Sequence, residues 1–288
     1  MIRALFIAAF FFTMTPLLIS IQWMLDKFNL PGWGFIAANY YRVLCSLLRI
    51  NVRVDGTPVR DRAVLYVSNH VSWVDILVIG SLSPVAFVAK REVRRWPLIG
   101  ITAELQRTVF VDRNRRHQTA DAVADMVKRL AGGTSVVLFA EGTSSDGNRV
   151  LPFRSALLGA VKHVAAHSDT AGDILIQPMS ICYTSTHGIP LGRQHRPLVA
   201  WYGDLDFMPH IKEFIARGAV DAVVNYGEPI KVDATADRKA LTRRLEGDVR
   251  GLMAAALLKR PIPAPAATPN AAAAAEIPAA PLEQAPAS

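Results

Sequence analysis

The sequence predicts an α/β protein with a mixed, largely buried sheet flanked by helices and preceded by N-terminal membrane-associated helices. Three observations support this prediction. Short apolar runs of strand length alternate with segments of helical spacing, several runs are apolar throughout, and two long apolar stretches, the first of them uncharged, dominate the first 50 residues. Strands that are apolar on both faces are typical of a sheet covered by helices.

The N-terminal stretch is expected to attach the chain to a membrane. No charged residue occurs from Ala4 to Leu25, and Pro16 interrupts this run without excluding a helix. A helix of these 22 residues, rising about 1.5 Å per residue, can cross a hydrocarbon core of roughly 30 Å. A cleaved signal peptide is the main alternative, but no obvious small-x-small cleavage site follows the run.

A second apolar stretch, Trp33–Ile50, predicts a helix that lies in the membrane interface. It contains Arg42, Arg49, Tyr40 and Tyr41, and aromatic and arginine side chains suit the headgroup level of a bilayer better than its centre. Whether the first helix spans the bilayer or lies flat is left open by the sequence.

Three segments follow from these patterns. We expect membrane-attachment helices in residues 1–50, an α/β domain in 51–260 and a disordered tail in 261–288. In the tail 19 of 28 residues are Ala or Pro, and such a composition cannot build a core.

The middle segment alternates between expected strands and helices. Apolar runs of strand length occur at Asn51–Asp55, Ala63–Ser68, Val85–Ala89, Thr108–Val111, Ser135–Ala140, Ile174–Tyr183, Leu198–Tyr202 and Ala219–Tyr226. Helical spacing occurs at Val74–Ile79, Gln118–Ala131, Ser155–His167 and Asp237–Lys259.

Charge and cysteine content narrow the class of protein. The formal net charge is +8 and the pI about 9.8, which favours an anionic partner, either nucleic acid or a membrane with acidic lipids. The two cysteines, Cys45 and Cys182, lie far apart in apolar stretches. They suggest neither a disulfide framework nor a zinc site, so a reducing compartment is expected.

The first candidate for chemistry is Ser68-Asn-His-Val-Ser-Trp-Val-Asp75, which follows an apolar strand. His70 could accept a proton from a hydroxyl group, and Asp75 could hold its ring in one tautomer. Ser72 and Asp75 are also spaced as a helix N-cap and its third residue, so Asp75 could serve only as a cap. For an isolated His-x4-Asp the cap is the better-supported interpretation, although the two roles are compatible.

Two further patterns are weak when taken alone. In Phe139-Ala-Glu-Gly-Thr143, an acidic side chain follows a buried strand, and the alternative is a solvated glutamate in an ordinary turn. Between Phe87 and His117 there are eight basic residues against three acidic ones, which suits phosphate or carboxylate groups or, more simply, a solvated or membrane-facing patch. No Gly-x-Ser-x-Gly elbow, Gly-x4-Gly-Lys-Ser/Thr loop or Gly-x-Gly-x2-Gly motif occurs.

Together and in order, these patterns resemble the glycerolipid acyltransferase family of the 1-acyl-glycerol-3-phosphate acyltransferase type. The resemblance rests on four blocks: Asn69–Asp75, Thr108–Arg113, Phe139–Thr143 and Leu175–Met179. It implies that His70 is the general base and that Asp75 orients it. It also implies acceptor binding by Arg113, Glu141, Gly142 and Thr143, and supporting roles for Asn69, Ser72, Trp73 and Pro178.

The choice of acceptor depends on a departure from that pattern. Ser144 follows Glu-Gly-Thr where the lysophosphatidate enzymes often carry an arginine that helps to hold the acceptor phosphate. Glu141–Leu157 and Ala200–Asp206 look most like the lyso-ornithine lipid acyltransferases, whose acceptor has a free hydroxyl on a fatty chain and no phosphate. Lyso-ornithine lipid is therefore the expected acceptor, with 1-acyl-glycerol-3-phosphate as the alternative.

The resemblance further implies no bound cofactor or metal and an acyl thioester, of acyl-carrier protein or coenzyme A, as co-substrate. The expected partners are membrane lipids, a lysolipid and acyl-carrier protein, and no nucleic acid. The expected location is the inner (cytoplasmic) membrane with the catalytic domain facing the cytoplasm, and the oligomeric state is open. A basic module that binds nucleic acid or anionic membranes, and a thioesterase, are the remaining alternatives.

Overall fold

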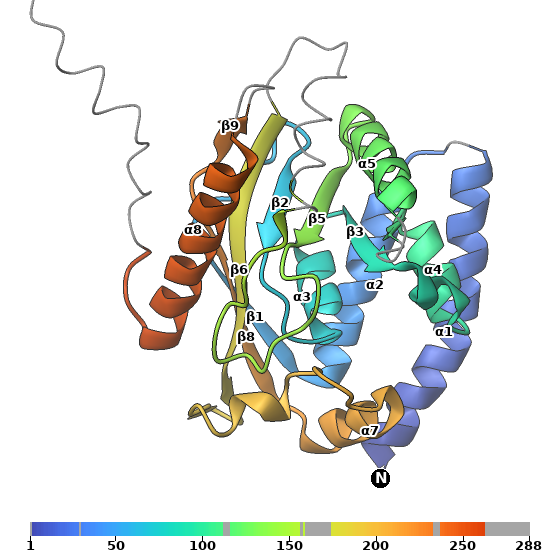
Figure 1. The fold of residues 1–288 in the computed structure, drawn as a ribbon. Coiled ribbons are helices and arrows are strands. Elements are labelled where there is room, and N and C mark those ends of the chain that lie inside the picture. Colours follow the sequence, from blue (N-terminus) through green and yellow to red (C-terminus); the bar gives the residue numbers. More distant parts are fainter. Residues whose placement is uncertain are drawn as a thin grey trace, which may run out of the picture.

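The computed structural model describes residues 2–28, 30–111, 116–155, 158, 174–232 and 237–262. Within these residues a nine-stranded sheet has helices on both faces (Figure 1). The helices are α1 (Ile2–Lys27), α2 (Trp33–Leu48), α3 (Val74–Leu82), α4 (Ile99–Leu105), α5 (Arg116–Ala131), α7 (Phe207–Arg217) and α8 (Arg238–Leu258), with 3₁₀ turns η1 (Arg91–Arg95) and η2 (Arg196–Leu198). The strands are β1 (Ile50–Asp55), β2 (Leu65–Ser68), β3 (Val85–Lys90), β4 (Val109–Val111), β5 (Ser135–Phe139), β6 (Ile174–Thr186), β7 (Ile189–Pro190), β8 (Val220–Tyr226) and β9 (Ile230–Val232).

The sheet is mixed, as predicted, and β2 lies at its centre in the order β1-β8-β6-β2-β5-β3-β4. β2 pairs in parallel with β5 and with β6, whereas β6 and β8 are antiparallel. Ser68 is aligned with Phe139 of β5 and with Met179 of β6. The motifs that follow β2 and β5 therefore leave the sheet at the same edge.

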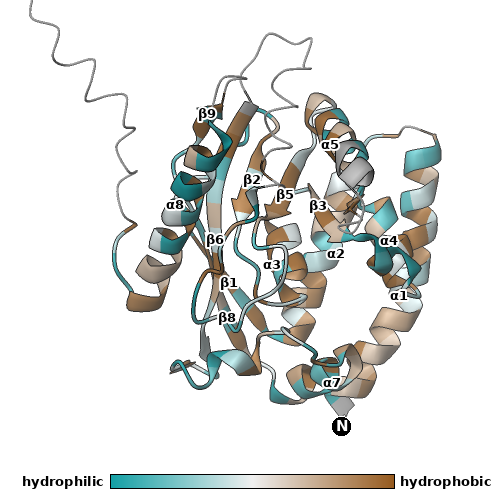
Figure 2. Ribbon diagram, viewed as in Figure 1, coloured by the Kyte–Doolittle hydropathy of each residue, from teal (hydrophilic) through white to brown (hydrophobic). Residues whose placement is uncertain are grey.

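Two apolar layers cover the two faces of the sheet. One contains buried residues of α5 and α8, and the other contains buried residues of α2, α3 and α7. The strands are hydrophobic along most of their length, while α8 turns hydrophilic residues to solvent (Figure 2). Burial on both faces explains why most strands could be recognised as apolar runs without alternation.

The strand predicted at Leu198–Tyr202 is wrong. Leu198 ends the 3₁₀ turn η2, and the residues after it form no strand. Val199 and Ala200 are buried because this segment covers the loop after β2, where the amide of Trp201 donates to the carbonyl of Val71 at 3.0 Å. The predicted helix Ser155–His167 lies outside the described residues except for Ser155 and Leu158, as does the predicted tail from residue 263 onward.

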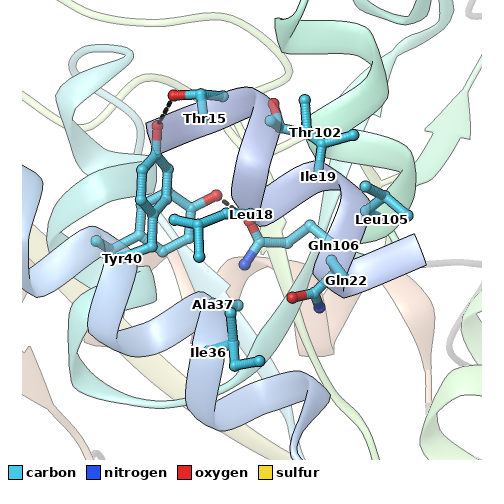
Figure 3. Close-up of a pocket in the computed structure, with 11 residues that line it drawn as sticks. Thr15, Leu18, Ile19, Gln22, Ile36, Ala37, Tyr40, Thr102, Leu105 and Gln106 are labelled. Carbon is cyan, nitrogen blue, oxygen red and sulfur yellow. Dashed lines mark hydrogen bonds between the residues drawn. The ribbon is translucent and has the colours of Figure 1, made fainter. Parts of the chain in front are cut away.

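The N-terminal helix α1 is long and apolar enough to cross a membrane, which supports membrane association. Only one stripe of it is buried: Ile7, Thr15 and Gln22 are 6%, 1% and 6% exposed. Thr15 and Tyr40 share a hydrogen bond of 2.6 Å, and Gln22 donates to the carbonyl of Trp33 at 3.2 Å. These polar groups face the protein, and with residues of α4 they line a cavity of about 50 Å³ between α1, α2 and α4 (Figure 3).

The second helix, α2, packs directly on the α/β layer. Tyr41 is 8% exposed and donates a hydrogen bond to Gln106, so its ring faces the protein, and the interfacial position of α2 stays a prediction. A Cβ built on Gly80 of α3 would lie 2.5 Å from a ring carbon of Tyr41. Only glycine allows α2 and α3 to approach this closely.

Gly80→Ala is expected to destabilise the protein by about 1–3 kcal/mol, because the methyl group would force Tyr41 out of a packed site. Thermal or denaturant unfolding of the purified chain measures the effect. Gly247 of α8 is the matched control, since a Cβ there has no neighbour within 4 Å. Gly247→Ala should leave stability unchanged or raise it by up to about 1 kcal/mol. Equal effects at both sites would contradict the packing account.

Candidate active site

His70 and Asp75 meet in the loop between β2 and α3. The Nδ1 of His70 lies 2.7 Å from Oδ2 of Asp75, and the Asp75 side chain is fully buried. A carboxylate can only accept, so Nδ1 carries the proton and Nε2 keeps its lone pair. The His70 side chain is 20% exposed, so part of the ring is open to a substrate.

Asp75 also holds the loop itself. Its Oδ2 accepts from the amides of Val71 at 2.7 Å and Ser72 at 3.1 Å. The carboxylate therefore holds the loop before α3 as well as His70, and its catalytic role stays a prediction. The capping interpretation is wrong, because α3 begins at Val74 with Trp73 before it and no side-chain cap.

Two aromatic residues complete the histidine's surroundings, and the sequence did not reveal either role. The hydroxyl of Tyr183 on β6 donates to Oδ1 of Asp75 at 2.6 Å. Burial and the Asp75 charge raise the pKa of Tyr183 well above its usual value, so the phenol remains a donor. Phe139 stacks on His70 with ring centroids 4.1 Å apart. Tyr183 lies 108 residues after Asp75, and no local spacing connects them.

Asn69 continues the pairing of β2 with β6 beyond the last strand residue. Its Nδ2 donates to the carbonyl of Ile181 at 2.8 Å, and its Oδ1 accepts from the amide of Ile181 at 2.9 Å. The side chain is fully buried and takes the place of a main-chain partner. Asn69 therefore fixes where the chain leaves the sheet, one residue before His70.

Glu141 lies beside the same loop, at the end of β5. It is only 2% exposed, so the alternative of a solvated glutamate is wrong. Its carboxyl oxygens accept from the amide of Leu151 at 3.0 Å and, more weakly, from that of His70 at 3.4 Å. Burial raises the pKa of Glu141 to about 8. In this geometry the Glu141 side chain holds the main chain at Leu151 and His70 in place. Its predicted contact with the acceptor stays a prediction.

Four other predicted site residues lie in the described part of the chain. Gly142 turns with φ of +72°, a conformation that suits glycine, and the neighbouring Thr143 is exposed. Trp73 donates from Nε1 to Nδ1 of His210 at 3.0 Å, and Pro178 is buried in β6 opposite Val67 of β2. Arg113 lies outside the described residues, so its predicted role is not placed by the structure.

Ser144, the position that departs from the family pattern, contacts a second segment. Its hydroxyl donates to the carbonyl of Trp201, whose amide donates to Val71. Ser144 thus joins the loop after β5 to the segment that covers the histidine loop. Among the residues that the structure describes, no group of three or more His, Cys, Asp or Glu side chains is placed to hold a metal ion.

Tyr183→Phe is expected to lower the free energy of unfolding by about 1–3 kcal/mol, because it leaves a buried Asp75 oxygen without a donor. It should also slow turnover, since Asp75 then holds His70 less firmly. Steady-state kinetics and denaturant unfolding measure the two effects. Tyr66→Phe is the control, because its lost hydrogen bond to the carbonyl of Val59 lies outside the site and should alter stability alone. Unchanged turnover in Tyr183→Phe would contradict a positioning role.

Comparison with known proteins gives the family. The family described as Acyltransferase matches residues 49–182. The chain is 44% identical to a lyso-ornithine lipid O-acyltransferase of Brucella abortus over 91% of this chain and 98% of the relative. It is 40% identical to one of Rhizobium meliloti over 88% of each.

A more distant relative, a 1-acyl-sn-glycerol-3-phosphate acyltransferase of Neisseria gonorrhoeae, is 26% identical over 68% of this chain and 72% of the relative. The crystal structure of the 1-acyl-sn-glycerophosphate acyltransferase PlsC from Thermotoga maritima has the same fold, with a TM-score of 0.59, 21% identity and coverage of 86% of this chain and 91% of that chain. The buried Asp75, the oriented His70 and these relatives agree, and the chain belongs to the acyltransferase family.

Proposed function

We propose that this enzyme transfers a fatty acyl group from a thioester to the hydroxyl of lyso-ornithine lipid. The observation that carries the proposal is the His70–Asp75 pair, which leaves a basic nitrogen at the carboxyl edge of the sheet. The relatives at 40–44% identity support the choice of acceptor, because both carry the name lyso-ornithine lipid O-acyltransferase.

The reaction needs only a base and a positioned thioester. Nε2 of His70 takes the proton of the acceptor hydroxyl as its oxygen attacks the thioester carbonyl carbon. The carbon–sulfur bond then breaks, and the departing thiolate receives the proton from the imidazolium. Asp75 stabilises that imidazolium through the 2.7 Å contact to Nδ1. No acyl-enzyme is required, since the thioester is already activated.

The residue at position 144 supports an acceptor without phosphate. Ser144 carries no charge, and its hydroxyl is engaged by the Trp201 carbonyl. Bidentate arginine contacts are the usual means of holding a phosphate group, and Ser144 cannot supply one. The alternative acceptor, 1-acyl-glycerol-3-phosphate, would have to be held by other cations such as Arg113.

For the donor and the location we propose acyl-carrier protein and the cytoplasmic face of the inner membrane. Lys90, Arg94 and Arg95 are exposed at the carboxyl end of β3, which lies next to β5 in the sheet. Both an acidic carrier protein and the phosphates of coenzyme A would be attracted there. A comparison of the two thioesters as donors, with this acceptor, decides between them.

His70→Ala is expected to lower transfer by about 10²–10⁴-fold while leaving membrane association intact, because it removes only the base. Asp75→Asn should lose less, since an asparagine oxygen can still accept from Nδ1 although its negative charge is gone. Turnover with saturating thioester and sedimentation with membranes measure the two properties. Transfer near the wild-type rate in His70→Ala would overturn the mechanism.

A panel of acceptors tests the proposed substrate. Membranes containing the protein should convert lyso-ornithine lipid much faster than 1-acyl-glycerol-3-phosphate, with either thioester. Faster conversion of the phosphate-containing lipid would replace the proposal by the alternative. Release of free fatty acid without a lysolipid product would indicate a thioesterase instead.

A further inference from the structure

A group of aromatic and apolar side chains lies beside the histidine loop without a role in the reaction. We define the α7 surface as Trp96, Trp201, Leu205, Phe207 and Met208. The three aromatic rings are packed together, with centroids 5.1 Å apart for Trp96–Phe207, 5.4 Å for Trp201–Phe207 and 6.2 Å for Trp96–Trp201. Trp73 of the histidine loop contacts the same group, 6.0 Å from Phe207.

This surface is not simply an edge of the core. Leu205 is 46% and Met208 58% exposed, and the three rings are half-buried. The Nε1 of Trp201 donates to the carbonyl of Leu205 at 2.7 Å, which fixes the short turn before α7. On the inner side of α7, His210 and Phe214 are buried. The helix therefore has one apolar side against the protein and further apolar residues directed to the surroundings.

The helix α7, whose first turn carries part of the α7 surface, ends beside the apolar helix α1. The N-terminal end of α1 lies against α7 in the fold (Figure 1). A side chain at Gly218, which follows α7, would collide with the guanidinium of Arg3. Along α1, large apolar side chains are exposed, among them Phe6 at 61% and Phe12 at 66%.

We propose that the α7 surface is a second membrane contact, which inserts into the headgroup region beside α1. Tryptophan rings prefer this depth of a bilayer, and single exposed leucine and methionine side chains gain by entering it. The exposed cation Lys212 on α7 would meet anionic lipid headgroups, as the net charge of +8 favours, whereas Arg217 is paired with Glu213 on the same helix. The position of α7 beside α1, whose exposed side carries large apolar residues, favours a lipid surface over a protein partner.

A membrane contact at the α7 surface would affect how the acceptor reaches His70. Trp73 belongs to both the histidine loop and the aromatic group, and Trp201 binds the loop through Val71. A membrane contact here would hold the loop at the level of the lipid hydroxyls. This consequence rests on the proposed function, whereas the contact itself does not.

Depth-dependent quenching tests the contact directly. Cys45 and Cys182 are buried, so a cysteine introduced at Met208 can be labelled selectively with an environment-sensitive dye. Leu258 of α8 is the matched control, because it is also 58% exposed and α8 covers the opposite face of the sheet. In vesicles of zwitterionic and anionic phospholipid, nitroxide-labelled lipids should quench the dye several-fold more at Met208→Cys than at Leu258→Cys. Equal quenching at the two positions would overturn the proposal.

A second measurement separates this contact from the catalytic proposal. Met208→Asp should lower transfer to acceptor embedded in vesicles roughly tenfold and leave transfer to detergent-dispersed acceptor unchanged. Leu258→Asp should change neither. A loss in both assays would mean a structural fault and would contradict the membrane role. Failure of all transfer would overturn the proposed function, while the quenching result would still decide the contact.

Discussion

Asp75 places a fully buried carboxylate among four hydrogen-bond donors that come from two distant parts of the chain, the loop after β2 and strand β6. The donors are His70, the amides of Val71 and Ser72, and Tyr183. An isolated charge at this depth would be costly, and its donors compensate for the lost water. The same bonds fix the tautomer of His70, the bend of the loop and the position of β6. The hydrogen bonds of Asp75 therefore both stabilise the fold and orient His70.

The main chain around His70 is held just as firmly as its ring. Asn69 ties the loop to β6, the amide of His70 faces Glu141, and the carbonyl of His70 accepts from the amide of Ser145 at 2.8 Å. Phe139 then stacks on the imidazole. Such supports restrict a ring to one orientation before the substrate arrives, which is the condition for efficient general-base catalysis.

The sequence predicted the features that depend on local pattern. The mixed sheet, β2, β5 and the helix at Gln118–Ala131 could be anticipated from apolar runs and spacing, and His70 with Asp75 from the order of the motif blocks. Tyr183, the stacking of Phe139 and the inward turn of Glu141 depend on strand order and register, which a single sequence does not specify. The predicted strand at Leu198–Tyr202 is wrong for a related reason. A segment buried against a loop and a strand buried in a sheet have similar apolar sequences.

Asp75 holds His70 with the proton on Nδ1 and the lone pair on Nε2. Nitrogen-15 NMR of histidine-labelled protein at mildly alkaline pH reports the tautomer directly, with His70→Ala identifying the signal. We expect a protonated Nδ1 and an unprotonated Nε2 for His70. A proton on Nε2, or an equal mixture of the two tautomers, would contradict it.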